Sequence, residues 1–188
     1  MIEIVSGTDR PGSYTKRVAD YVLGVYREQK LDVDLIDLNQ LNYADVAGGD
    51  YYKGARGSFA TAVERVTKAD GVVLVVPEYN GSYPGALKMF IDYWRYPSTF
   101  ENRPFAFVGL GTRWGGLRPV EHLQQVVGFR SAYCFPHRVF LANIKEIFKE
   151  GRVTDPLCHE LVEKQAREFH RFIRGLKDQG LHANVQSK

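Results

Sequence analysis

The sequence predicts an α/β protein in which a single parallel, doubly wound sheet has helices on both faces. Short β-rich runs alternate with longer segments of helical periodicity, and two of these runs, at residues 71–76 and 105–110, are apolar throughout. A strand that is apolar along its whole length is buried on both faces, as in a parallel sheet between two layers of helices. The length of 188 residues suits one domain, which we expect to span residues 1–177. We expect the polar remainder, residues 178–188, to be a frayed tail.

Five segments have the composition of strands, and we place them at residues 2–5, 32–37, 71–76, 105–110 and 138–141. The fifth is the least regular, because Pro136 splits a β-rich stretch and proline donates no hydrogen bond to a sheet. Five helical patterns lie between or after the strands, at residues 18–26, 59–66, 85–96, 120–127 and 157–176. In each, apolar residues recur at the three- and four-residue spacings of a helix face.

The loops after the strands are the places to look for a ligand, since open α/β sheets bind ligands beyond the carboxyl ends of their strands. The first loop, residues 6–15, has Gly7 and Gly12 at the spacing of a P-loop, but Ser13 replaces the expected lysine. The G-x-G-x-x-G pattern is also missing, so two common nucleotide motifs are excluded. What remains is four serine and threonine hydroxyl groups, the guanidinium of Arg10 and a helix start, which together suit a terminal phosphate. The same hydroxyls are also typical helix caps.

The second candidate loop, residues 77–85, contains two tyrosines, an asparagine and two glycines. These groups can stack on a flat heterocycle and hydrogen-bond its edge, although a tight turn followed by a helix cap explains the same composition. The next loop, residues 111–116, has three glycines, which let the backbone approach a ligand closely. Asp37 ends the second strand, where it either contacts a ribose or is solvated.

Several other classes of chemistry find no support in the sequence. The 25 basic and 22 acidic residues nearly balance and form no basic run, so we expect no nucleic-acid partner. Two cysteines and five unpaired histidines make no zinc motif, and we expect no metal. No apolar run approaches the roughly 20 residues of a membrane helix, and the start has no signal-peptide pattern. We therefore expect a cytoplasmic protein without a membrane partner.

The loops resemble those of the NAD(P)H-dependent FMN reductase family, flavodoxin-like proteins that include quinone, azo-dye and chromate reductases. Residues 77–88, PEYNGSYPGALK, are the most specific element and are similar to the family pattern PEYN-G-S-x-P-G-x-L-K. Residues 7–15 resemble the phosphate loop G-S-x-R-x-x-S-x-N, with Thr8 and Thr15 in place of serine and asparagine. The glycines of residues 111–116 resemble the ring-contacting loop, and residues 151–155 resemble the segment before the last helix. The likeness covers about residues 1–177.

The resemblance implies a flavodoxin-like, five-stranded sheet of order 2-1-3-4-5 that binds FMN. The implied cofactor-binding residues are Thr8, Arg10, Ser13, Tyr14, Thr15, Pro77, Glu78, Tyr79, Asn80, Gly81, Ser82, Thr112, Gly115 and Gly116. The first five come from the phosphate loop, and the others line the isoalloxazine ring.

The implied activity is hydride transfer from NADPH or NADH to the flavin and then to a small acceptor such as a quinone, free flavin or azo compound. This chemistry belongs to the cofactor, so no side chain is expected to act as a catalyst. Two alternatives stay open: a flavodoxin-like FMN electron carrier with a protein partner, and a binder of another nucleotide. Arg113 is either a contact for the NADPH 2′-phosphate or a solvated side chain.

Two features suggest how the chain meets other molecules. The helix at residues 85–96 has a second apolar stripe of Ala86, Met89 and Tyr93, so we expect a homodimer or homotetramer unless loops of the same chain cover the stripe. The loop over residues 38–57 is long for a compact domain. It either borders the substrate opening or is solvated and disordered.

Overall fold

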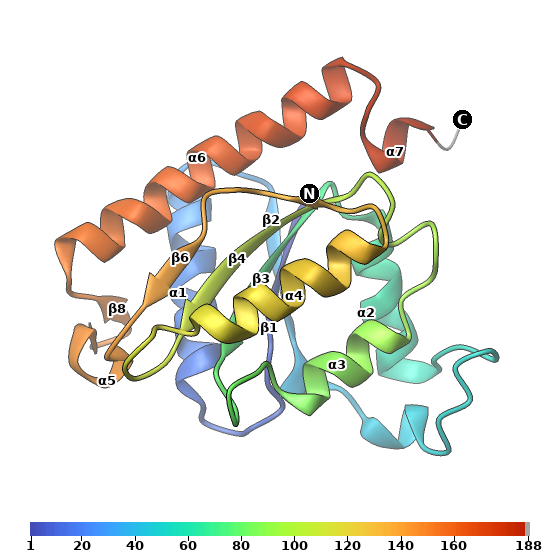
Figure 1. The fold of residues 1–188 in the computed structure, drawn as a ribbon, viewed down its shortest axis with the longest axis horizontal. Helices are drawn as coiled ribbons and strands as arrows, with labels where there is room; N and C mark the ends of the chain where they lie inside the picture. Colours follow the sequence, from blue (N-terminus) through green and yellow to red (C-terminus); the bar gives the residue numbers. More distant parts are fainter. Residues whose placement is uncertain (187–188) are drawn as a thin grey trace.

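A computed structural model describes residues 1–186 of the chain. Its main sheet is parallel and has the order β2-β1-β3-β4-β5, with β6 also paired to β4 (Figure 1). The strands are β1 (Ile2–Ser6), β2 (Val33–Asp37), β3 (Gly71–Pro77), β4 (Pro104–Leu110), β5 (Tyr133–Cys134) and β6 (Val139–Leu141). The predicted fold class and strand order are confirmed.

The fifth position of the sheet is occupied by two short strands rather than one. β5 pairs with the start of β4, and β6 pairs with its end. Gln165 fills the break: its side-chain amide donates to the carbonyl groups of Phe107, at 3.0 Å, and His137, at 2.7 Å. The predicted strand at residues 138–141 therefore corresponds to β6, while β5 is too short to stand out before Pro136.

Helices cover both faces of the sheet. The principal ones are α1 (Tyr14–Glu28), α2 (Gly57–Lys68), α3 (Gly85–Asp92), α4 (Leu117–Phe129) and α6 (Pro156–Asp178). Shorter elements are η1 (Leu38–Gln40), η2 (Tyr43–Val46), α5 (Ile144–Ile147), the hairpin of β7 (Phe148–Lys149) and β8 (Arg152–Val153), and α7 (Ala183–Gln186). α3 ends at Asp92, short of the predicted residue 96, and Pro97 disfavours helical geometry in the residue before it.

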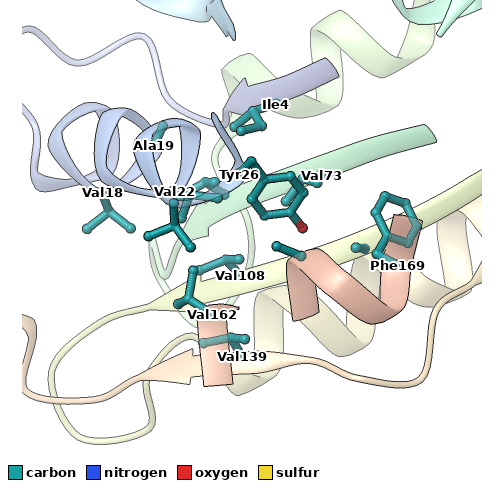
Figure 2. Close-up of a cluster of buried hydrophobic side chains, with 14 of the residues drawn as sticks. Ile4, Val18, Ala19, Val22, Tyr26, Val73, Val108, Val139, Val162 and Phe169 are labelled. Atoms are coloured by element: carbon teal, nitrogen blue, oxygen red, sulfur yellow. The ribbon is translucent and has the colours of Figure 1, made fainter. Parts of the chain in front are cut away.

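Two hydrophobic clusters form the core, one on each side of the sheet. α1 and α6 pack on one face, where Val22 and Tyr26 of α1 share a cluster with Val162 and Phe169 of α6 and with Val108 of β4 (Figure 2). α2, α3 and α4 pack on the other face. The strand interiors are buried on both sides, as their apolar composition predicts.

The segment after α6 is packed rather than frayed, which corrects the expectation for residues 178–188 over the part described. His182 is fully buried and donates from Nε2 to the carbonyl of Asp70 at 2.6 Å. Asn184 donates to the carbonyls of Lys68 and Ala69 at 3.1 and 3.3 Å. These contacts hold residues 182–184 against the end of the sheet where the strands begin. Residues 187–188 lie outside the described part of the chain.

A buried arginine anchors the same edge. Arg103 is 1% exposed, and its guanidinium donates to Asn184 Oδ1 and to four backbone carbonyls, those of Thr67, Ala69, Ser98 and Thr99. Burial lowers the pKa of Arg103 to about 10, so the group stays charged at neutral pH. The carbonyl oxygens compensate for the loss of solvent around that charge.

Candidate functional site

A cavity of about 600 Å³ opens at the carboxyl ends of β1, β3 and β4. β1 lies between β2 and β3, so this is the point at which the strand order reverses and where doubly wound sheets bind ligands. The lining residues come from four loops that are distant in sequence. They are Arg10, Tyr14, Thr15, Pro77, Glu78, Tyr79, Asn80, Gly81, Leu110, Gly111, Thr112, Trp114, Ile144 and Lys145.

The first loop lies directly against β3 because Gly7 has no side chain. The Gly7 amide donates to the carbonyl of Val75 at 2.9 Å, and a Cβ atom on Gly7 would lie 2.8 Å from that oxygen. The loop then turns towards α1, where Ser13 Oγ accepts a hydrogen bond from the Lys16 amide at 3.3 Å. Ser13 therefore caps the helix, as its sequence position suggested. The loop conformation directs the N-terminus of α1 towards the cavity.

The buried hydroxyl of Thr8 stabilises the conformation of the same loop. Thr8 is fully buried, and its Oγ1 accepts from the Arg10 amide at 3.3 Å and lies 3.0 Å from the Tyr79 hydroxyl. Arg10 lies with its guanidinium 5.4 Å from the centre of the Tyr79 ring, and within residues 1–186 it forms no ion pair. An unpaired arginine beside a helix start is a suitable site for a phosphate group.

The loop after β3 forms a tight two-residue turn. The backbones of Tyr79 and Ser82 exchange two hydrogen bonds, of 2.8 and 3.0 Å, around Asn80 and Gly81. Both central residues have positive φ, 51° and 79°, as in a type I′ turn, which favours asparagine followed by glycine. The turn gives the loop a fixed shape on one side of the cavity.

Glu78 and Ser82 extend this loop towards α4. The Glu78 carboxylate lies 3.8 Å from the guanidinium of Arg118. Ser82 Oγ lies 2.9 Å from Nδ1 of His122 and faces the neighbouring groove between α3 and α4. Of the predicted residues in this loop, Pro77 to Gly81 line the cavity, and Ser82 lies next to it.

Two of the three glycines after β4, Gly115 and Gly116, pack against the sheet and do not line the cavity. Gly115 and Gly116 are buried with φ of 58° and 78°. A Cβ atom on Gly115 would lie 2.9 Å from the Ala142 amide nitrogen, and one on Gly116 would lie 2.7 Å from that of Leu110. Their small size lets the loop pack against β4 and β6. The neighbouring Thr112 lines the cavity as predicted, together with Gly111 and Trp114.

Sequence reasoning missed the contribution of the segment after β6. The Asn143 amide donates to the carbonyl of Thr112 at 2.5 Å, and the Ile144 amide donates to that of Gly111 at 3.0 Å. These bonds bring Ile144 and Lys145 to the cavity. The sequence could have indicated this contribution. All strands of a parallel sheet end at the same edge, so the loop after the fifth strand lies beside the other candidate loops.

The loop after β2 packs against Tyr93 at the C-terminal end of α3. Tyr51 lies over Tyr93 with ring centres 4.7 Å apart, and the Tyr93 hydroxyl donates to the Val46 carbonyl at 3.1 Å. Burial, together with the nearby carboxylates of Asp9 and Asp37, raises the pKa of Tyr43. Tyr93, expected in an exposed apolar stripe, is thus covered by its own chain.

Asp37 is engaged locally, because its carboxylate accepts a hydrogen bond from the Asn39 amide at 3.1 Å and caps η1. Over residues 1–186, no group of three His, Cys, Asp or Glu side chains is arranged to hold a metal ion. No helix in that part of the chain is both long enough and apolar enough to cross a membrane.

Comparison with known proteins shows the family of this chain. Residues 1–146 match the family model of the NADPH-dependent FMN reductases. The chain is 29% identical to an NAD(P)H-dependent FMN reductase of Pseudomonas aeruginosa, over 92% of this chain and 95% of that protein. It is 30% identical to a quinone reductase of Escherichia coli, over 66% and 70% of the two chains.

The fold is also similar to that of a solved flavoenzyme. FerB, an NAD(P)H:(acceptor) oxidoreductase from Paracoccus denitrificans, superposes with a TM-score of 0.73 over 93% of this chain and 97% of that one, at 22% identity. The flavodoxin-like strand order, the phosphate-type first loop and the family match therefore agree. The chain belongs to the NADPH-dependent FMN reductase family and is an FMN-dependent NAD(P)H oxidoreductase.

Proposed function

We propose that FMN lies in the cavity with its phosphate at the first loop and its ring between the loops after β3 and β4. One observation carries this proposal: a single cavity joins the start of α1 and Arg10 to the Tyr79–Ser82 turn and Thr112. A cavity of about 600 Å³ falls within the ordinary range for cofactor sites. The donors near α1 are neutral or cationic, which suits a phosphate.

Each part of the cavity has a distinct role in holding the cofactor. Thr8, Arg10, Ser13, Tyr14 and Thr15 form the phosphate side. Arg10 supplies the charge, while Thr8 and Ser13 keep the loop in shape. The ring side consists of Pro77, Glu78, Tyr79, Asn80, Gly81, Ser82, Thr112, Gly115 and Gly116, of which Ser82, Gly115 and Gly116 act by supporting the loops.

Bound FMN supplies the redox chemistry, a two-electron transfer from NAD(P)H to an acceptor. The residues that line the cavity would position the ring, and backbone amides near it would stabilise the negative charge that reduction creates. α3 begins at Gly85, separated from the Tyr79–Ser82 turn by two residues, and its N-terminal end would add a favourable field for that charge.

We further propose that the acceptor is a small planar molecule, namely a quinone, a free flavin or an azo compound. The name of the Escherichia coli relative, a quinone reductase, supports this class. We also propose that the loop over residues 38–57, which packs on α3, borders the opening for this acceptor. A flavodoxin-like electron carrier is the alternative, and it would not oxidise NAD(P)H directly.

A homodimer or homotetramer in the cytoplasm completes the proposal. A groove between α3 and α4 adjoins Ser82 and has a volume of about 640 Å³. Exposed apolar side chains lie on or near it: Met89 is 38% exposed, Tyr96 56% and Phe129 79%. Such a surface supports contact with a second copy. The two cysteines are free, which supports a reducing compartment.

The experiment is to purify the protein, record its absorption spectrum, and identify any cofactor released by denaturation by its mass. We expect FMN, and oxidation of NADPH or NADH when an acceptor is added. Release of FAD, or failure to take up any flavin on reconstitution, contradicts the proposed site. A flavin that NAD(P)H does not reduce supports the carrier instead.

A further inference from the structure

The Asn80-Gly81 pair at the tip of the loop after β3 brings together the two groups that react in spontaneous deamidation. In that reaction the backbone nitrogen of the following residue attacks the side-chain amide carbon of the asparagine. The C–N bond of the amide breaks, ammonia leaves and a cyclic succinimide forms, which water then opens to aspartate or isoaspartate. A following glycine hinders the attack least because it has no side chain, and Asn80 is the only asparagine in the sequence that precedes a glycine.

Neither reacting group is engaged by the protein. Asn80 is exposed, and within residues 1–186 its side-chain amide forms no hydrogen bond to another protein group. The Gly81 nitrogen donates to no acceptor in that part of the chain either, because both hydrogen bonds of the turn join Tyr79 to Ser82. The attack therefore removes no existing contact of the Asn80 side chain.

A cation lies beside the pair. A Cβ atom on Gly81 would lie 3.9 Å from a guanidinium nitrogen of Arg118, and the Glu78 carboxylate lies 3.8 Å from the same guanidinium. A nearby positive charge favours the anionic form of a group. Arg118 thus stabilises the deprotonated Gly81 nitrogen and the oxyanion that forms on the Asn80 amide when it is attacked.

The closed turn opposes the reaction. It holds Asn80 at a φ of 51° in type I′ geometry, and closing the succinimide ring requires rotation about ψ of Asn80 until the Gly81 nitrogen faces the side-chain carbon. That rotation breaks the two hydrogen bonds between Tyr79 and Ser82, of 2.8 and 3.0 Å. Asn80 therefore reacts from an open turn, and any ligand that keeps the turn closed slows the reaction.

We propose that Asn80 is a site of spontaneous deamidation and that the occupant of the cavity controls its rate. The inference rests on the proposed function, in which FMN lies against the loop after β3. Asn80 and Gly81 both line that cavity, so bound FMN keeps the turn closed and the cofactor-free protein deamidates faster. The product has an additional carboxylate on the ring side. That charge opposes the negative charge created by reduction, and the aged protein binds FMN less tightly.

The test is peptide mapping by mass spectrometry during incubation of FMN-loaded and FMN-free protein at mildly alkaline pH. We expect the peptide with Asn80 to gain the mass difference between an amide and an acid, several-fold faster without FMN. Urea-unfolded protein gives the rate of the open chain and should be fastest. Asn143 is the internal control, because it is also exposed, with a positive φ of 49°, but is followed by Ile144.

Three variants separate the reaction from its consequence. Asn80→Gly keeps a pair that favours this turn and should show no mass change in its peptide. Asn80→Asp supplies the product from the start, and the loss of one donor should raise the FMN dissociation constant a few fold. Arg118→Ala should slow the conversion of the FMN-free protein, and an unchanged rate contradicts the part assigned to that cation.

FMN-free protein in which Asn80 stays intact while urea-unfolded protein converts overturns the inference, and so does an equal rate with and without FMN. An Asn80→Asp protein that binds FMN like the wild type contradicts the consequence. The flavin absorbance of each sample is recorded before incubation. Wild-type protein that takes up no FMN contradicts the proposed function itself, whereas protein that takes up FMN but whose empty form keeps Asn80 intact contradicts only this inference.

Discussion

The hydroxyl groups of Thr8 and Tyr79 lie 3.0 Å apart and join the loop after β1 to the loop after β3. The bond is partly shielded from water, since Thr8 is fully buried and Tyr79 is half-buried. It connects the side of the cavity that suits a phosphate to the side that suits a ring. The two halves of the site are therefore held in register by the protein before any ligand binds.

Tyr79→Phe tests this connection. The substitution keeps the ring but removes the bond to Thr8, whose net contribution is about 0.5–1.5 kcal/mol. We expect the FMN dissociation constant to rise a few fold and the thermal unfolding midpoint to fall by roughly 2–4 °C. Fluorescence titration of apoprotein with FMN measures the constant. Tyr52→Phe is the control, because Tyr52 is fully exposed at a loop tip; equal constants for all three proteins contradict the expectation.

Arg10→Ala tests the phosphate side of the site. Loss of a charge-assisted hydrogen bond costs about 1.5–3 kcal/mol, so we expect FMN to bind about tenfold more weakly or worse, while riboflavin, which has no phosphate, binds as before. The same titration measures both ligands. Arg27→Ala, in the last turn of α1, provides the control. An Arg10 variant with unchanged FMN affinity would show that this arginine is only a surface charge.

Gln165→Leu tests how the broken fifth strand is stabilised. The buried Gln165 amide satisfies the carbonyls of Phe107 and His137, and leaving a buried polar group without a partner costs about 1–3 kcal/mol. We expect the free energy of unfolding in urea to fall by roughly that amount. Gln125→Leu, at an exposed position on α4, is the comparison. A similar small change in both variants contradicts a role for Gln165 at the break.

The tail contact of His182 predicts a dependence of stability on pH. Burial lowers the pKa of His182 below its ordinary value of 6.5, despite its hydrogen bond to Asp70. The unfolded chain therefore takes up a proton before the folded chain does, and stability falls as the pH drops below about 6.5.

The Asp70 carboxyl does not titrate in the pH range in which His182 does. Hydrogen bonds from Lys177 and the N-terminal amine outweigh the effect of burial and hold its pKa at about 2. Urea unfolding at pH 7.5 and 5.5 measures the dependence. We expect the His182→Gln protein to lose part of the pH dependence of stability. His170 also has a lowered pKa, so the His170→Gln protein measures the contribution of that second histidine. A His182→Gln protein with the full wild-type dependence counts against this assignment.

Met89→Asp tests the proposed assembly. Met89 is 38% exposed on α3, and a carboxylate there would be buried without a partner in a two-fold contact. Light scattering coupled to size exclusion should give the mass of two or more chains for the wild type and a lower average mass for the variant. Leu157→Asp, at a residue 64% exposed on α6, should not change the mass. A wild-type mass of one chain at all concentrations rules out the assembly.

Much of this architecture follows from local patterns in the chain. The apolar runs of β3 and β4 require cover on both faces, and the helices between the strands supply it. The Asn80-Gly81 pair specifies its own turn, because both residues tolerate positive φ. These features depend on neighbours in sequence, so they are visible without a structure.

Other parts of the site depend on contacts between distant residues. Lys145 reaches the cavity because the backbone after β6 bonds to the loop after β4. Gly115 and Gly116 are small because they touch the sheet, which composition cannot distinguish from contact with a ligand. His182 and Asn184 find carbonyl partners more than a hundred residues away, so their segment resembled a solvated tail.

The break at Pro136 also affects how the protein avoids aggregation. An unprotected strand at the border of a sheet is a template on which another chain can add a strand. Here that border consists of β5 and β6, of two and three residues, separated by a stretch that includes a proline without an amide proton. Neither piece offers a long row of free donors and acceptors. Sheet extension between copies is thereby disfavoured at this edge of the sheet.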